Sequence, residues 1–450
     1  MRRTGLTVRG FGLGTIGLCW AVAAAGEPLT VERAVQLALK QNSQVIGAQA
    51  GVLDARGGLY GAYAGVIPML SASLTQVESK TTGQSGKTLI AGQVFPVDED
   101  SRFTSTTPTL SASWSGLRLS SWAGLSSARQ GLKASHLRLS AARNDVALSA
   151  RQQFYEVVKA IKLADVAEGA VKLARDDQRR VRALFEVGSV SKSDLLKAQV
   201  RTAQSELDNL TARHNIVSQR NLLAGLLGLR EAELGDVDTV LTVVPSSYEE
   251  AEILAEAGKN RPDLIAAEAE LGAARAGHTS ARLARLPYVT AGGSLELGAK
   301  SEFTQDDRVS GLTRSGDDRS DRQLSAQVAL RWDLFDGLAT DARIASARAR
   351  LERARNASGV LQRNLANEVH EAMLAHREAV ERDSVARKAL ESATESLKLT
   401  QEKYNVGSAT ILELIDAQVQ LQRAQSDGVS ALAAIRVAEA QISRIRGRAE

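Results

Sequence analysis

Two hydrophobic periods alternate along this chain, one typical of helices and one typical of strands. Four proline-free stretches rich in Ala, Leu, Gln, Arg and Glu predict long helices, at about 121–186, 191–230, 340–404 and 410–447. Between Pro68 and about 118, and between Pro287 and about 336, apolar and polar residues alternate instead. The pattern predicts a mainly α fold of long antiparallel helical hairpins (about 121–230 and 340–447), combined with two pairs of strands.

The last helical stretch carries the clearest packing pattern. Apolar residues or glycine recur every seven residues, with alanine between them: Leu414, Leu421, Gly428, Ile435 and Ile442, then Ala417, Ala424, Ala431 and Ala438. This spacing predicts a coiled-coil seam, and alanine at every second seam position predicts close helix packing. A comparable stripe in the first half consists of Leu196, Ala203, Leu210, Val217 and Ala224.

The alternating regions predict four strands of membrane-crossing length. Their apolar positions lie within 70–74, 110–114, 289–297 and 324–334. A tilted strand needs about ten residues to cross a membrane. The Ser/Gly/Lys-rich segment 79–103 and the Asp/Arg-rich segment 301–322 predict soluble loops between paired strands. Four strands cannot close a barrel, so either they lie outside a membrane or several chains share one barrel in a symmetric oligomer.

The same elements occur twice along the chain. Phe185–Val200 returns in the second half as Tyr404–Val419, with seven of sixteen positions identical. The two copies are offset by 219 positions, but Trp114 and Trp332 are 218 positions apart. One residue has therefore been gained or lost between the strands. No catalytic residue set recurs in both halves, and the repeated feature is therefore architecture.

Each predicted hairpin turns at a glycine followed by a capping motif. Gly188 and Gly407 stand where a helix would end in a left-handed residue. Capping boxes follow at Ser191-x-x-Asp194 and Thr410-x-x-Glu413. These signals predict tight helix reversals, and capping is an alternative to any other role of the two acidic residues.

Residues 1–25 have the features of a secretory signal peptide: three arginines, an apolar run and a closing Ala-Ala-Ala. The remaining chain then divides into a first repeat, 26–247, and a second, 248–450. The one cysteine, Cys19, lies in the signal, which predicts a bacterial envelope protein without disulfides. Removing the three arginines lowers the net charge from +4 to +1, which gives no indication of nucleic-acid binding.

No enzyme signature is present in the sequence. Gly12-x-Gly14-x-x-Gly17 matches a dinucleotide fingerprint but lies in the predicted signal peptide, and the five histidines are scattered. We therefore expect no catalytic residues, no metal site and no cofactor.

In order and spacing, several short segments resemble those of TolC-type outer-membrane efflux proteins. They are Leu29–Val35, Arg261-Pro262-Asp263-Leu264, Leu334-Phe335-Asp336-Gly337 and the two Val-Gly-Ser turns. The resemblance implies a homotrimer with a shared 12-stranded β-barrel in the outer membrane of a Gram-negative bacterium, in contact with its lipid, and a coiled-coil tunnel through the periplasm. It also implies docking of a periplasmic adaptor and an inner-membrane pump.

The resemblance also assigns roles to residues at the hairpin turns. Tyr404 and Asp194 match a link that helps to hold the tunnel closed, and Glu413 and Asp416 match an acidic constriction. Ala409 replaces the family's gating arginine, whose partner position here is Ser193. We expect the adaptor to contact the apices of the two hairpins, formed by Val187, Gly188, Ser189, Val406, Gly407 and Ser408.

The leading interpretation is a passive exit duct of a tripartite system that exports small molecules. An exit duct for type I protein secretion would have the same tunnel and a different partner. A periplasmic adaptor would need split lipoyl halves around one hairpin, and a structural coiled coil would not explain the alternating strands.

Overall fold

The computed structural model describes residues 28–90, 92–241, 248–307, 313–319 and 322–447, so the predicted signal peptide lies outside the described residues. The chain forms two compact units. The first comprises the chain up to Ala38, Ala150–Val243 and Arg382–Arg436; the second comprises Leu39–Ser149, Val244–Glu381 and the chain from Val437. Each unit combines segments from both halves of the sequence.

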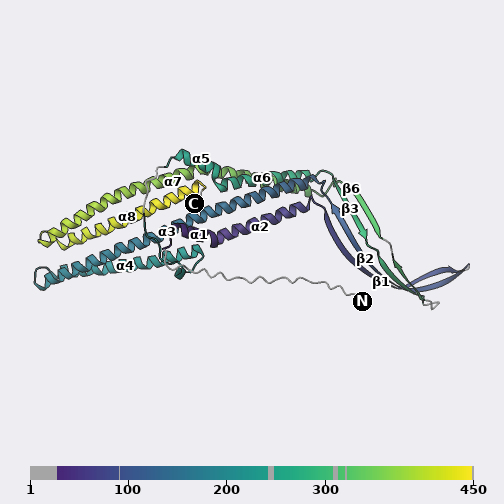
Figure 1. Ribbon diagram of the computed structural model, residues 1–450, viewed down its shortest axis with the longest axis horizontal. Coiled ribbons are helices and arrows are strands. Elements are labelled where there is room, and N and C mark those ends of the chain that lie inside the picture. The colour runs from purple at the N-terminus through teal and green to yellow at the C-terminus, as the bar shows by residue number, and fades with distance from the viewer. Residues whose placement is uncertain (1–27, 91, 242–247, 308–312, 320–321, 448–450) are drawn as a thin grey trace, which may run out of the picture. The chain divides into compact units, whose positions relative to one another are not determined.

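Long helices form the hairpins that the helical period predicted (Figure 1). They are α3 (Leu119–Glu186) with α4 (Lys192–Leu227), and α7 (Ala339–Asn405) with α8 (Ile411–Ile445). Before the strands of each half lie two shorter helices, α1 (Val31–Gln41) and α2 (Ser43–Ala64), then α5 (Glu250–Asn260) and α6 (Pro262–Leu283). Both ends of α5 and α6 lie at the repeat offset from the corresponding ends of α1 and α2. A short 3-10 helix, Glu231–Glu233, follows α4.

Two residues at equivalent positions mark the breaks between the short helices. Asn42 caps α2 by accepting a hydrogen bond from the Gln44 N–H at 2.9 Å. The buried Arg261 at the corresponding break pairs with Asp263 at 2.8 Å and with Glu368 of α7 at 2.5 Å. Beside this pair, apolar residues of α5, α6, α7 and α8 form a core of the second unit, including Ile253, Leu264, Val369 and Ile442.

The predicted seam of α8 is confirmed. Seven of its nine positions are buried, and Leu421 and Gly428 are half-buried. The buried seven are Leu414, Ala417, Ala424, Ala431, Ile435, Ala438 and Ile442. At Gly428 an added Cβ would meet no described atom within 4 Å beyond the adjoining part of its own helix. Gly428 lines a groove of about 480 Å³ together with Gly169 of α3 and Leu390 of α7. The missing side chain therefore leaves a gap in an otherwise close-packed seam.

The stripe predicted for α4 does not form its contact face within the chain. Leu196, Leu210 and Val217 are each more than half exposed. The buried face of α4 carries small residues instead, among them Ala198, Thr202 and Ser205. Of the predicted stripe only Ala224 is buried, because the heptad spacing identifies an apolar face but not the neighbour that covers it.

The strands form one antiparallel sheet (Figure 1). They are β1 (Met69–Ile90), β2 (Gln93–Trp114), β3 (Tyr288–Glu296), β4 (Lys300–Asp307), β5 (Thr313–Arg319) and β6 (Gln323–Arg331). β2 pairs with β1 on one side, and on the other with β3 near its end and with β4 farther along. β3 pairs with β6 and β4 with β5, so the sheet is four strands wide.

The predicted loops at 79–103 and 301–322 are wrong over most of their length. The first continues β1 and β2 as a ladder out to the pair Ile90–Gln93, and the second contains β4 and β5. Most positions of both segments are polar, and neither segment carries a sustained period of two, the signal used to recognise strands. Backbone hydrogen bonds between adjacent strands form these ladders without that alternation.

The period-two apolar positions share one face of the sheet. Register aligns Ala72 with Leu110, Leu110 with Leu295, and Leu295 with Leu324. A second row joins Leu70, Ala112, Gly293 and Ala326. The opposite face carries mostly polar residues, such as Ser71 and Ser111, whose hydroxyls lie 2.8 Å apart. The sheet therefore has one apolar and one mostly polar face.

Both strand pairs keep the same register at their base. Met69 faces Ser113 and Tyr288 faces Arg331, so in each half the next position would pair a proline with a tryptophan. The Trp114 indole N–H donates to the Val66 carbonyl at 2.9 Å, and that of Trp332 donates to the Arg285 carbonyl at 3.1 Å. These two acceptors are themselves equivalent positions of the sequence repeat.

The residue by which the two repeats differ in length lies in a β-bulge of the first half. Thr81 faces Ser101 but Gln84 faces Glu99, so β1 holds one extra residue there. Gly83 in this bulge has a left-handed φ of 71° and donates its N–H to the Asp100 carboxylate at 2.9 Å. In the second half, Lys300 faces Arg319, in the same register as Glu296 and Gln323.

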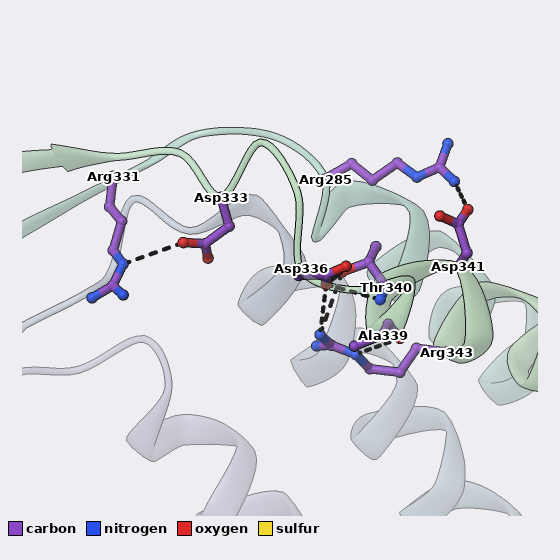
Figure 2. A network of polar contacts seen from close by, with 8 residues as sticks. All are labelled: Arg285, Arg331, Asp333, Asp336, Ala339, Thr340, Asp341 and Arg343. Atoms are coloured by element: carbon purple, nitrogen blue, oxygen red, sulfur yellow. Dashed lines mark hydrogen bonds and ion pairs between the residues drawn. The ribbon is translucent and has the colours of Figure 1, made fainter.

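A polar network fixes the start of α7 where the chain leaves β6 (Figure 2). The Asp336 carboxylate accepts hydrogen bonds from the Thr340 N–H at 2.9 Å and the Thr340 hydroxyl at 2.6 Å. Thr340 is also the main cause that lowers the pKa of Asp336. Gly337 and Leu338 follow with left-handed φ values of 65° and 71°. The Leu-Phe-Asp-Gly motif is therefore a strand-to-helix turn with its own cap.

Candidate functional site

The hairpin turns belong to the first compact unit and have the same backbone geometry. Gly188 has φ 77° and Gly407 has φ 75°. After α3, the Ser189 N–H donates to the Leu184 carbonyl at 2.8 Å; after α7, the Ser408 N–H donates to the Lys403 carbonyl at 2.9 Å. These six-to-one bonds are Schellman motifs, and they confirm the glycine-terminated helices that the sequence predicted.

Both predicted N-caps are present. The Thr410 hydroxyl accepts the Glu413 N–H at 3.3 Å, and Glu413 accepts the Thr410 N–H at 2.8 Å, which completes a capping box. The Ser191 hydroxyl accepts the Asp194 N–H at 3.2 Å and donates to the Asp194 carboxylate at 2.8 Å. These caps fix the acidic residues at the first turns of α4 and α8.

The apices project away from the packed helices. Val187 is 75% exposed and Val406 is 78% exposed. Gly188, Ser189, Gly407 and Ser408 are exposed as well. Behind them a small apolar core joins all four helices through Val181, Ala198, Ile411 and Leu414, with Leu397 and Tyr404 packed against it.

Ser193 lies on the first turn of α4 and Glu413 on the first turn of α8, with Asp416 one turn farther along α8, and all three residues are exposed. Glu413 and Asp416 lie three residues apart on α8, so their carboxylates share one side of its first turns. The Asp194 carboxylate, by contrast, lies 3.4 Å from the Lys197 ammonium group. Hydrogen bonds from Ser191 and Lys197 lower the pKa of Asp194.

Tyr404 and Asp194 lie near one another without a hydrogen bond from the Tyr404 hydroxyl. That hydroxyl is buried and has no hydrogen-bond partner among the described residues. Burial raises the pKa of Tyr404, and the charges of Asp194 and Asp177 raise it further. The link between Tyr404 and Asp194 therefore stays a prediction.

Sequence reasoning missed a buried polar pair below the turns. Asp177 of α3 accepts a hydrogen bond from the Gln418 amide of α8, and both side chains are buried. A signal was available, because Asp177 continues the series of buried positions Val171, Ala174 and Val181. A charged residue within such an apolar series indicates a specific partner.

Among the described residues, no group of three or more His, Cys, Asp or Glu side chains could hold a metal ion. Within the same part of the chain, no helix combines the length and apolar character needed to cross a membrane.

The chain belongs to the outer membrane efflux protein family. The sequence profile of that family matches residues 34–229 and 253–448, once in each half. Its members and structural neighbours are channels rather than enzymes, and they support an outer-membrane location.

Solved channel structures share the fold. VceC of Vibrio cholerae matches with a TM-score of 0.77 and 19% identity, over 93% of this chain and 96% of that one. CmeC of Campylobacter jejuni matches with a TM-score of 0.77 and 16% identity, over 99% and 94%. The open state of MtrE of Neisseria gonorrhoeae matches with a TM-score of 0.74 and 19% identity, over 93% and 89%.

One curated relative is Nodulation protein T of Rhizobium leguminosarum bv. viciae, which is 25% identical over 257 residues. The match covers 55% of this chain and 49% of that protein, so the chain spans about half the length of this relative.

Proposed function

We propose that this chain assembles as a homotrimer that forms a passive exit duct of a tripartite efflux system, exporting small molecules across the periplasm and outer membrane. One observation carries the proposal: the sheet has two free edges. Among the described residues, β1 pairs only with β2, and β5 and β6 end the other side. Successive antiparallel pairings leave β1 and β6 running in opposite directions, so β6 of one copy suits β1 of the next.

A shared barrel would satisfy both edges, since hydrocarbon tolerates no unpaired backbone groups. Three copies of a sheet four strands wide give twelve strands, with the apolar face toward outer-membrane lipid. The exposed stripe of α4, including Leu196, Leu210 and Val217, supports helix contacts between copies in a periplasmic tunnel. Membership of the outer membrane efflux protein family supports the same architecture.

At the tunnel's periplasmic end, the exposed Val-Gly-Ser apices are the proposed contact for a periplasmic adaptor, which would connect the duct to an inner-membrane pump. Glu413 and Asp416 would gather six carboxylates around a threefold axis and favour cations. Tyr404, Asp194 and Ser193 would help to set the closed state. The two sequence repeats, 26–247 and 248–450, would each supply one hairpin and one strand pair to the wall.

The mass of the complex purified in detergent tests the assembly. We expect a particle of three chains; a stable, folded monomer in detergent would contradict the shared barrel. Identification of the pump that co-purifies with the cross-linked complex then separates drug efflux from type I protein secretion, for which the tunnel would be the same.

A further inference from the structure

A buried carboxylate–amide pair connects the first hairpin to the second below their turns. Asp177 is 6% exposed and Gln418 is 4% exposed. The Gln418 amide donates to one Asp177 oxygen, which joins α3 to α8. Neither residue belongs to a turn or a cap, so the pair has no role in ending the helices.

The Asp177 carboxylate is incompletely satisfied in this position. In the described part of the chain its second oxygen has no hydrogen bond, and the Arg180 guanidinium lies 3.4 Å from it. The Tyr404 hydroxyl is also buried and makes no hydrogen bond among the described residues. It is close enough for the Asp177 charge to raise its pKa. A buried ionised carboxylate with an oxygen that lacks a hydrogen bond disfavours the packed arrangement unless it takes up a proton.

The charged and titratable groups around Asp177 come from each neighbouring helix. Asp176 and Arg180 lie on α3, Tyr404 on α7, and Asp194 of α4 acts on the same tyrosine hydroxyl. Burial is the largest effect and raises the pKa of Asp177, while the Gln418 hydrogen bond and Arg180 partly oppose it. The α8 partner itself, Gln418, is neutral.

We propose that Asp177 and Gln418 form a proton-controlled contact, here called the lock, and that the protonation state of Asp177 determines how tightly the two hairpin tips pack together. Ionised Asp177 is a buried charge that gains from exposure to water, so it favours separation of α3 from α8. The protonated acid has no such charge and favours the packed arrangement. This inference rests on the proposed duct, for which it supplies a mode of regulation.

The direction of the pH effect follows from linkage. The packed state binds the Asp177 proton more tightly than a separated, hydrated state does, because burial raises its pKa. Packing is therefore favoured most below the pKa of the hydrated carboxyl and loses this advantage as pH rises through the higher pKa of the buried one. Acidification should therefore tighten the packing of the tips, and a rise in pH should loosen it.

Spin labels on cysteines placed at Ser189 and Ser408 of the full-length protein in detergent or nanodiscs report the spacing of the tips. Glu413→Gln and Asp416→Asn are included in every variant, so that the mouth carboxylates do not titrate. We expect the label distances to shorten as the pH is lowered stepwise from 7.5 toward the usual carboxyl pKa of about 3.9. Asp177→Asn should hold them at the acid value throughout the series, whereas Asp176→Asn, at the exposed neighbour, should keep the pH response.

Gln418→Met provides a second test if Asp177→Asn misfolds. It removes a hydrogen bond that favours the ionised form, so the midpoint of the distance change should move to higher pH. An unchanged pH response in Asp177→Asn, or an unmoved midpoint in Gln418→Met, would overturn the lock. Absence of any ion conductance by these proteins in planar bilayers would instead count against the proposed duct, because the distances are measured independently of conduction.

Discussion

Two substitutions on α8, three residues apart, should change stability in opposite directions. Gly428 opens onto a groove of about 480 Å³, whereas Ala431 is 0% exposed. Gly428→Leu gains about 0.8 kcal/mol of helix propensity and enters empty space. Ala431→Leu adds three carbons to a closed seam, and such overpacking costs about 1–3 kcal/mol.

The assay is irreversible thermal unfolding of the detergent-solubilised complex at one fixed heating rate, because kinetic stability depends on that rate. A loss of about 1–2 kcal/mol that falls on the unfolding barrier raises the unfolding rate about 5- to 30-fold. Ala431→Leu should unfold at a lower temperature than the parent protein and Gly428→Leu at the same or a higher one. Gly169→Ala, on the opposite wall of the groove, is the matched control and should not destabilise the protein. Equal losses for both leucine variants would refute the reasoning, because they would mean that the groove is filled in the assembled protein.

Three further outcomes are expected. Bulky substitutions at Ser189 and Ser408 should abolish adaptor crosslinking and drug resistance without affecting membrane insertion; unchanged crosslinking and resistance would exclude the apices as the contact. The double change Glu413→Gln and Asp416→Asn should remove cation selectivity and block by multivalent cations in planar bilayers, and persistence of both would refute an acidic ring. Thr410→Ala should weaken the start of α8 by about 1 kcal/mol, visible as faster amide exchange in its first turn, and unchanged exchange would show that the cap contributes little.

Local signals made the helices and their turns predictable. Gly188 and Gly407 occupy left-handed positions that other residues adopt only with strain, and the capping boxes involve residues three apart. The seam of α8 was predictable because its neighbours lie in the same chain. In α4 the heptad pattern identified an apolar face, yet the described chain leaves Leu196 and Val217 more than half exposed.

Features that depend on distant partners could not be read from the sequence. The outer ladders, formed by the far parts of β1 and β2 and by β4 and β5, are mostly polar, and backbone pairing requires no hydrophobic period in the side chains. The contact between Asp177 and Gln418 joins residues 241 positions apart. The sequence shows only that a charge interrupts a buried series, and the identity of its partner depends on how the helices pack.

The position of the bulge at Gly83 determines what an added residue does to the strand pair. An odd residue inserted at the base would turn every later side chain of that strand to the opposite face. Here the additional residue is confined to the outer ladder, so the apolar rows nearest Pro68 and Trp114 match those of the second half. The register of each strand pair is thus set at its base. The outer ends can lengthen, shorten or accept an inserted epitope while the base alignment stays unchanged.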